Sequence, residues 1–276
     1  MRDSTATQTR KTASTEESPH ERRMIPRSSG PKLSVVMPAY NERSTIEEIL
    51  WRVQEVGIEK EIILVDDGST DGTREFLQEL ARAVGQEPAI MTLPGTGRRL
   101  PTENIRVFFQ DQNHGKGAAV RRGFQQARGE FVIVQDADLE VDPQDYHKLL
   151  EPMEQGAADV VYGSRFLGGP RPVPRSWPVI ANKCLTLFSN LFTGLNLSDV
   201  WTCYKLFRSE VLKKIELKED RFGFEPEVTA KVAKNHWRIY EVPISYHGRT
   251  YAAGKKIGWK DGIRGLWCTV RYSILD

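Results

Sequence analysis

The sequence lacks the cysteine pattern of a disulfide-stabilised or zinc-binding protein. Its 276 residues include three cysteines, which are widely separated and form no Cys-x-x-Cys pair. Such usage favours a reduced, cytosolic compartment. No stretch reaches the ~20 apolar residues that a membrane span needs. Residues 1–30 have no apolar core of the kind found in a secretory signal, and we expect them to form a disordered tail.

A strong net charge is also missing. The chain has 39 Lys and Arg against 37 Asp and Glu, and once the six basic and four acidic residues of the tail are removed, 33 of each remain. This balance argues against a nucleic-acid partner. Acidic residues are absent between Val160 and Ser198, and from Gly248 onward six basic residues accompany two acidic ones. Two basic zones in a neutral body indicate either local anion binding or solvated loops.

Strand and helix patterns alternate from Lys32 onward. Residues 86–104 hold three prolines and two glycines, which is typical of a surface loop. Alternating strands and helices predict an α/β fold with a mostly parallel sheet covered on both faces. We expect strands at 33–37 (stopped by Pro38), 61–65, 105–109, 131–134, 159–162, 200–207 and 238–246, and helices at 44–56 (capped by Ser44 with Glu47), from 71 (capped by Asp71), 115–127, 143–154 and 226–235.

Two later segments show apolar residues at helical spacing. The stripe from Ile180 to Leu195 is interpreted as core rather than as a membrane-binding surface. The segment Gly258 to Leu275 contains two tryptophans and several basic residues. Such a helix can lie on an anionic membrane or dock on the sheet, and both interpretations are kept.

The most informative run is 131–140, where a strand ends in Asp136 and Asp138. In an extended segment residues i and i+2 point to the same side, so both carboxylates can face one hard divalent cation. The carboxyl edge of a parallel strand is also where an open α/β sheet binds its ligand. The pair indicates a metal-held diphosphate, although an isolated Asp-x-Asp is more often an ordinary acidic turn.

Three companion segments strengthen that interpretation. Each follows a predicted strand and places polar side chains and permissive glycines at the same sheet edge: 38–42, 66–73 and 113–117. Asp67 could accept hydrogen bonds from a base or ribose, Tyr40 could pack against a base, and Lys116 could meet a phosphate. Any one of these segments alone is ordinary turn chemistry.

At this point the chain resembles a known family. The motifs VVMPAYNE, ILVDDGSTDGT, NHGKGAAVRRGF and QDADLE are similar to the nucleotide-binding half of inverting family-2 glycosyltransferases of GT-A fold. VVYGSRF, DVWTCYKLFR, FGFEPEVTAKVA and EVPISYHGRTYAAGKKIGWKDG resemble dolichyl-phosphate mannose and glucose synthases. The resemblance covers residues 33 to about 272. It implies a Rossmann-like, mostly parallel sheet flanked by helices, a nucleotide-sugar half at 31–163 and a C-terminal acceptor-binding extension at 164–276.

The resemblance also implies roles for single residues. Metal ligands would be Asp136, Asp138 and Glu140, the last standing where related synthases often have Gln, and the cation would be Mg²⁺ or Mn²⁺. Asp136, Asp138 and Arg165 would be catalytic. The nucleotide sugar would meet Pro38, Tyr40, Glu42, Asp67, Lys116, Asp136, Ala137 and Asp138, and the acceptor phosphate would meet Arg165, Arg249, Lys255 and Lys256.

The implied reaction moves mannose or glucose from GDP-mannose or UDP-glucose to a polyprenyl or dolichyl phosphate. It would occur at the cytosolic membrane face, reached through the membrane surface or a membrane-protein partner. A phosphate oxygen is largely ionised near pH 7, so it needs positioning more than a general base. One displacement at the anomeric carbon predicts inversion.

Two alternatives use the same fold features differently. A glycosyltransferase acting on a hydroxyl acceptor in glycan or cell-envelope synthesis needs a carboxylate base, for which Asp199, Glu225 and Glu227 are candidates. A nucleotidyltransferase usually has a Gly-rich, basic loop after its first strand, and residues 38–42 occupy that place instead. We therefore favour transfer to a lipid phosphate.

Overall fold

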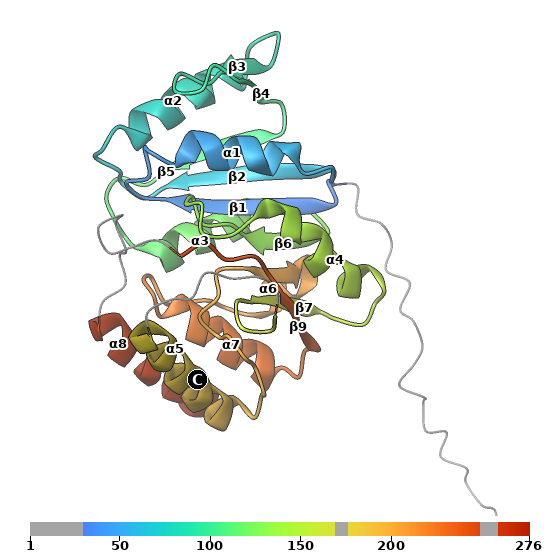
Figure 1. Ribbon diagram of the computed structural model, residues 1–276, viewed down its shortest axis with the longest axis vertical. Helices are drawn as coiled ribbons and strands as arrows, with labels where there is room; N and C mark the ends of the chain where they lie inside the picture. Colours follow the sequence, from blue (N-terminus) through green and yellow to red (C-terminus); the bar gives the residue numbers. More distant parts are fainter. Residues whose placement is uncertain (1–29, 169–175, 249–258) are drawn as a thin grey trace, which may run out of the picture.

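A seven-stranded sheet forms the centre of the molecule in the computed structural model, which describes residues 30–168, 176–248 and 259–276 (Figure 1). The strand order is β5-β2-β1-β6-β8-β7-β9, and β8 alone runs antiparallel to its neighbours. The predicted mostly parallel α/β sheet is confirmed. The strands are β1 (Leu33–Ala39), β2 (Lys60–Asp66), β5 (Ile105–Phe109), β6 (Phe131–Val134), β7 (Val160–Ser164), β8 (Lys205–Arg208) and β9 (Ile239–Pro243).

Helices cover both faces of this sheet. The core on one face includes α1 (Ile46–Glu55), α2 (Thr73–Ala83) and α4 (Tyr146–Glu154). The other face carries α3 (Lys116–Gln126) and α7 (Phe224–Lys234). The remaining helical elements are α5 (Ser176–Thr193), α6 (Ser209–Lys214), α8 (Trp259–Val270), a 3-10 turn (Pro143–Asp145) and a π turn (Arg271–Leu275).

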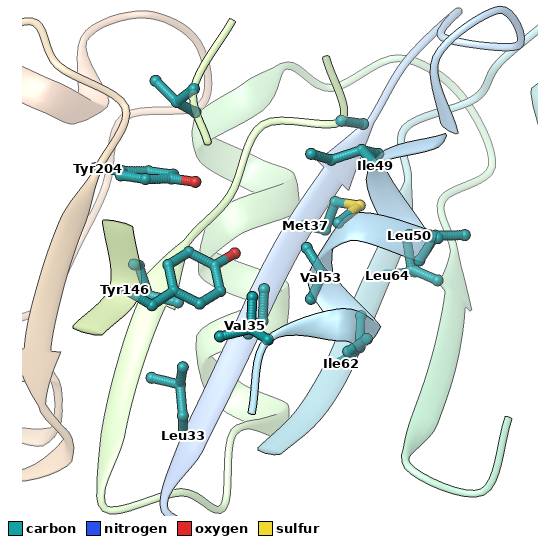
Figure 2. Packing of buried hydrophobic residues seen from close by; sticks show 14 of the residues in the cluster. Leu33, Val35, Met37, Ile49, Leu50, Val53, Ile62, Leu64, Tyr146 and Tyr204 are labelled. Carbon is teal, nitrogen blue, oxygen red and sulfur yellow. The ribbon is translucent and has the colours of Figure 1, made fainter. Parts of the chain in front are cut away.

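The alternation of side chains along β1 explains the two cores. Leu33, Val35 and Met37 point toward α1, where they meet residues such as Ile49 and Val53 (Figure 2). The intervening Val36 lies on the opposite face, in a cluster with Ala119 of α3. A strand buried on both faces reads as an unbroken apolar run, which is what made β1 recognisable in the sequence.

The order of the strands places the ligand edge. The chain runs from β1 outward through β2 to β5, and then returns to form β6 on the other side of β1. The strand order therefore reverses between β1 and β6. In an open α/β sheet, ligands bind outside the carboxyl ends of the strands at such a reversal.

Several predicted boundaries were wrong. β1 continues through Pro38 to Ala39. The backbone groups of its even-numbered residues point toward β6, as the Val36 carbonyl does when it accepts from Gln135, and that pairing ends at Val36. The missing N–H of Pro38 therefore costs no bond between strands. The expected loop at 86–104 contains a small hairpin, β3 (Ile90–Thr92) with β4 (Arg99–Pro101). The expected strand at 200–207 begins only at Lys205, whose buried ammonium donates to the carbonyls of Val200 and Thr202 and holds them in a turn.

The two predicted helix caps, at Ser44 and Asp71, differ in outcome. No side chain caps α1: the carbonyl of Glu42 accepts from the amides of Thr45 and Ile46, so the predicted Ser44 capping box is wrong. Glu47 instead binds Arg43 and the amide of Gly95. Asp71 lies one residue before the N-cap of α2, yet its carboxylate accepts from the amide of Thr73 in the first turn.

The apolar stripe of α5 was placed wrongly in the core. Ile180, Leu187 and Leu191 are exposed, and Thr186 and Ser189 are buried in their place. None of the helices among the described residues has the length and hydrophobicity needed to cross a membrane. The expected disordered tail falls almost entirely on residues 1–29, which lie outside the described part of the chain.

Candidate active site

The four polar strand ends are joined to one another at the reversal between β1 and β6. Asn41, after β1, receives a hydrogen bond at its side chain from the amide of Thr70, and its own amide donates to Ser69 Oγ, at 2.8 and 3.1 Å. The amide of Glu42 donates to Thr73 Oγ1 at 2.9 Å. The segments after β1 and β2 therefore form one unit.

Further contacts connect these segments with the Asp-x-Asp segment and with the loop at 113–117. Thr45 Oγ1 donates to the carbonyl of Ala137 at 2.9 Å and lies 3.0 Å from Glu42 Oε2, which links β6 back to β1. The Lys116 ammonium reaches Asp136 at 2.9 Å. The sequence-predicted grouping of 38–42, 66–73, 113–117 and the Asp-x-Asp segment is thus what the fold brings together. Pro38 and Tyr40 are half-buried at the same edge.

Asp67 anchors the loop before α3. Its two carboxylate oxygens accept from the side chains of Gln110 and Asn113 and from the amides of His114 and Gly115, at 2.5 to 3.1 Å. Burial raises the pKa of Asp67 above its ordinary value, and these donors oppose that rise. The predicted contact of Asp67 with a base or ribose stays a prediction, and its observed partners are all protein groups.

Replacing Asp67 by asparagine is expected to destabilise this loop. An asparagine NH₂ group would face two of the four donors, and buried donors that lose their acceptor cost about 1–3 kcal/mol each. We expect the free energy of unfolding to fall by roughly 2 kcal/mol or more. Hydrogen exchange of the His114 and Gly115 amides, compared with the wild type, checks this directly. Unchanged protection of both amides would contradict the anchoring role.

Lys116 links the Asp-x-Asp segment to the start of α7. Its ammonium lies 2.9 Å from Asp136 and 3.0 Å from Glu225 at the start of α7. Burial alone would lower the pKa of Lys116, but the two carboxylates outweigh it and raise the pKa well above its ordinary value. The lysine is therefore charged, and its predicted phosphate contact would come in addition to the two carboxylate contacts.

The glycines beside Lys116 have a packing role. Gly115 has a φ of 108°, and a Cβ there would overlap the carbonyl of Asp220. A Cβ on Gly117 would overlap the carbonyl of Glu219. The backbone of 219–221 therefore lies directly against the start of α3, and only glycine permits that approach.

Arg165 is fixed by a buried carboxylate. Its Nε and Nη2 donate to the two oxygens of Asp199 at 2.7 and 2.8 Å, and Asp199 is 0% exposed. Burial alone would lower the pKa of Arg165, but Asp199 outweighs it and raises the pKa. The guanidinium also lies over the ring of Tyr246 at 5.2 Å. It is therefore a rigid, permanent positive charge.

Glu140 connects the Asp-x-Asp segment with Arg165. Its amide donates to Asp138 Oδ1 at 3.0 Å. Its carbonyl accepts from the amide of His247 at 2.7 Å, and the next residue, Val141, pairs with Tyr246, whose ring lies under Arg165. The carboxylate of Glu140 contributes to a raised pKa of Tyr246, for which burial is the main cause. The third residue of the motif thus stands beside the cation that was predicted to meet the acceptor.

The predicted metal ligands offer a suitable donor set. Asp136, Asp138 and Glu140 provide carboxylate oxygens at a strand end and are all half-buried, which suits Mg²⁺ or Mn²⁺. Within residues 30–168, 176–248 and 259–276, no three His, Cys, Asp or Glu side chains already converge as a metal cluster. The ligand set stays a prediction. Arg249, Lys255 and Lys256 lie outside the described residues.

The three candidate bases are engaged with protein groups. Asp199 pairs with Arg165, and Glu225 pairs with Lys116. Glu227 is 0% exposed and accepts from the amides of Lys218 and Glu219 and from the ammonium of Lys231. Glu227 is therefore a structural residue, whose main work is to hold the segment that packs against α3.

Sequence reasoning missed the partners of Arg165. Asp199 was considered only as a base, although it is the first acid after the acid-free stretch from Val160 to Ser198 and so was a natural ion-pair partner. Tyr246 lies in the EVPISYHGRT motif and at the end of the expected strand 238–246, but neither placed it beside Arg165. Their proximity to Arg165 depends on the packing of segments more than thirty residues apart.

Comparison with known structures addresses the fold. Glucosyl-3-phosphoglycerate synthase from Mycobacterium tuberculosis, crystallised with Mn²⁺, uridine diphosphate and phosphoglyceric acid, matches with a TM-score of 0.64 at 18% sequence identity. The match covers 90% of this chain and 80% of that one. It supports the GT-A fold.

Comparison with known sequences addresses the family. Polyprenol monophosphomannose synthase of Mycolicibacterium smegmatis is 31% identical over 233 residues, covering 81% of this chain and 80% of that protein. Undecaprenyl-phosphate mannosyltransferase of Micrococcus luteus is 29% identical over 237 residues, covering 82% and 88%. The profile of Glycosyl transferase family 2 matches residues 34–216. The chain therefore belongs to glycosyl transferase family 2.

Proposed function

We propose that the protein transfers a hexose from a nucleotide sugar to a polyprenyl phosphate. The observation that carries this proposal is the position of Arg165, a rigid guanidinium held by buried Asp199 over the ring of Tyr246, which pairs with Val141 just after the Asp-x-Asp segment. A guanidinium has five N–H donors, of which Asp199 accepts two, and its planar geometry suits phosphate oxygens. The donor diphosphate and an acceptor phosphate would therefore meet at adjacent groups of the same sheet edge.

The relatives support the acceptor class but differ in the sugar, since others are named for galacturonate and for 4-deoxy-4-formamido-L-arabinose. Both relatives described above are named as transferring mannose to a polyprenyl or undecaprenyl phosphate. Mannose from GDP-mannose is the first donor to test, and glucose from UDP-glucose is the second. We also propose that the enzyme works peripherally at the cytosolic face of a membrane, since a polyprenyl chain stays in the bilayer.

The mechanism follows from where charge develops. Negative charge grows on the diphosphate as the sugar leaves, and Mg²⁺ or Mn²⁺ held by Asp138 with Asp136 and Glu140 would stabilise it when bound. Lys116 orients Asp136 through its ion pair. Arg165 would hold the acceptor phosphate with one oxygen toward the anomeric carbon, and a single displacement would invert that centre.

A phosphate acceptor is favoured because its ionised oxygen carries no proton that a base must remove. An ionised phosphate oxygen attacks without a base, whereas a hydroxyl needs one. Asp199, Glu225 and Glu227 are all held by protein cations or amides. This arrangement favours a phosphate acceptor over the hydroxyl acceptor of the alternative reaction.

A comparison of two acceptors tests the proposal. The protein is incubated with Mn²⁺, labelled GDP-mannose or UDP-glucose, and either a polyprenyl phosphate or the corresponding polyprenol. We expect organic-phase label with the phosphate and only background with the alcohol. Label on the alcohol alone, or on neither acceptor with either donor, would refute the phosphate assignment.

Glu140→Gln is expected to retain most transfer activity and to change the metal preference. Glutamine keeps one oxygen ligand but removes a negative charge from the site, so binding of the cation should weaken. Titrating Mg²⁺ and Mn²⁺ against initial rate measures the change, with Glu130→Gln before β6 as a control remote from the motif. Complete inactivity at saturating metal would show that the carboxylate itself is indispensable.

A further inference from the structure

Helix α5 buries polar side chains and exposes apolar ones. Its buried face carries Thr186 and Ser189, which are 4% and 1% exposed. Its outward face carries Trp177, Leu187 and Leu191, at 77%, 62% and 74% exposed. A helix on the surface of a globular protein normally does the reverse. The inversion is a property of the whole face, because the apolar residues recur with helical spacing from 177 through 180, 184 and 187 to 191.

Helix α8 extends the same surface. It packs against α5, and both helices pack on α7, so their exposed sides lie away from the sheet (Figure 1). In α8, Cys268 and Thr269 are buried while Ile263 and Trp267 are 57% and 51% exposed. We call the exposed apolar residues of the two helices the outer face: Trp177, Ile180, Leu187 and Leu191 of α5 with Ile263 and Trp267 of α8.

The outer face belongs to a helix that also touches the candidate site. Asn182, on α5, lies with its side-chain amide 3.4 Å from Asp199 Oδ1, and the same oxygen accepts from Arg165. One helix therefore contacts the carboxylate that fixes Arg165 and presents apolar side chains outward. Whatever covers the outer face sits within one helix of the acceptor-phosphate candidate.

The charges near the outer face indicate which kind of surface covers this face. Helix α5 contains no acidic residue, and its Lys183 is exposed. Acids are absent from the sequence between Val160 and Ser198. Helix α8 adds one acid, Asp261, and one exposed base, Arg264. An apolar face whose α5 half carries a lysine and no acid suits the interface of an anionic bilayer, where such a helix lies in the membrane plane.

We propose that the outer face lies in the surface of an anionic lipid bilayer and brings Arg165 to the level of the lipid phosphates. This inference rests on the proposed function in one respect, because a polyprenyl phosphate keeps its chain in the bilayer and its phosphate at the surface. A second copy of the chain is the competing occupant. It would have no need of an α5 free of acids, and the experiment below separates the two.

Vesicle sedimentation with the full chain tests the inference. Vesicles of phosphatidylcholine and phosphatidylglycerol are mixed with the wild type, with Leu187→Ser/Leu191→Ser, and with the matched control Ile90→Ser/Tyr240→Ser. The control residues are also exposed, at 37% and 46%, but belong to β3 and β9. We expect the double variant in α5 to lower the partition constant at least tenfold and the control to change it less than twofold. Thermal unfolding confirms that both variants are folded.

The outcomes separate the surface from the acceptor assignment. Selective loss of vesicle binding in the α5 variant, with unchanged turnover of a short, water-soluble prenyl phosphate, supports both proposals. The same loss of binding without turnover of any prenyl phosphate supports the surface and refutes the acceptor. Equal binding of all three proteins, or no binding by the wild type, overturns the surface. A wild-type dimer that the α5 variant dissociates, without vesicle binding, also overturns it and assigns the face to a second copy.

Discussion

Asp138→Ala is expected to reduce sugar transfer at least 10³-fold, equivalent to about 4 kcal/mol of transition-state stabilisation. The carboxylate of Asp138 accepts a hydrogen bond from the amide of Glu140. Asp138 follows β6, one of the two strands between which the strand order reverses. Without it the cation would lose a ligand at the place where the diphosphate leaves. Initial rates at saturating donor and Mn²⁺ measure the loss.

The folded state should be nearly unaffected by the same change. The carboxylate of Asp138 is half-buried, and its loss removes the hydrogen bond from the Glu140 amide, worth about 1 kcal/mol. Asp111→Ala, just after β5 and separated from β6 by two strands, is a matched control, since Asp111 is exposed and pairs with His114. If the Asp138 variant keeps wild-type rates while folded, the metal assignment is wrong.

Arg165→Ala is expected to have the largest effect on stability. It leaves Asp199, which is 0% exposed, as a buried carboxylate without its cation, and breaking a buried pair in this way costs about 3–5 kcal/mol. Transfer should be lost as well, because the acceptor phosphate would lose its guanidinium. Chemical denaturation measures the first effect and initial rates measure the second.

Two comparisons separate burial from charge pairing. Arg238→Ala removes a guanidinium that also binds a carboxylate with two nitrogens, that of Asp159 at 2.9 and 2.8 Å, but its side chain is 56% exposed. We expect a cost near 1 kcal/mol or less there. Adding Asp199→Asn to Arg165→Ala should recover part of the stability and none of the activity. A cost for Arg165→Ala no larger than that for Arg238→Ala would contradict the buried-pair interpretation.

Most of the fold could be predicted from local sequence patterns. The apolar runs of β1, β2 and β6 and the helical spacing of α1 are properties of neighbouring residues, so their order and the parallel sheet were predictable. The grouping of the four strand ends followed from the same order, because parallel strands end at one edge. The hairpin β3–β4 was missed because prolines and glycines also permit short extended pieces.

Long-range contacts account for what could not be predicted. The pairing of Lys116 with Glu225 joins residues that are 109 positions apart, and only the docking of α7 brings them together. Asp67 was predicted to face a ligand, and its engagement by the loop at 113–115 depends on how that loop folds back. Whether the apolar stripe of α5 is buried or exposed depends on which side of the helix packs against α7. Periodicity alone cannot distinguish a buried stripe from an exposed one.

The mass of the lipid product tests the central claim most directly. The wild-type protein is incubated with GDP-mannose or UDP-glucose, Mn²⁺ and a polyprenyl phosphate of known length, and the organic phase is examined by mass spectrometry. Transfer of the sugar alone to the acceptor phosphate predicts the acceptor plus one anhydrohexose, with one phosphorus atom and one nucleoside diphosphate released per product. A product with a second phosphorus atom, or no lipid product with either donor, would contradict it.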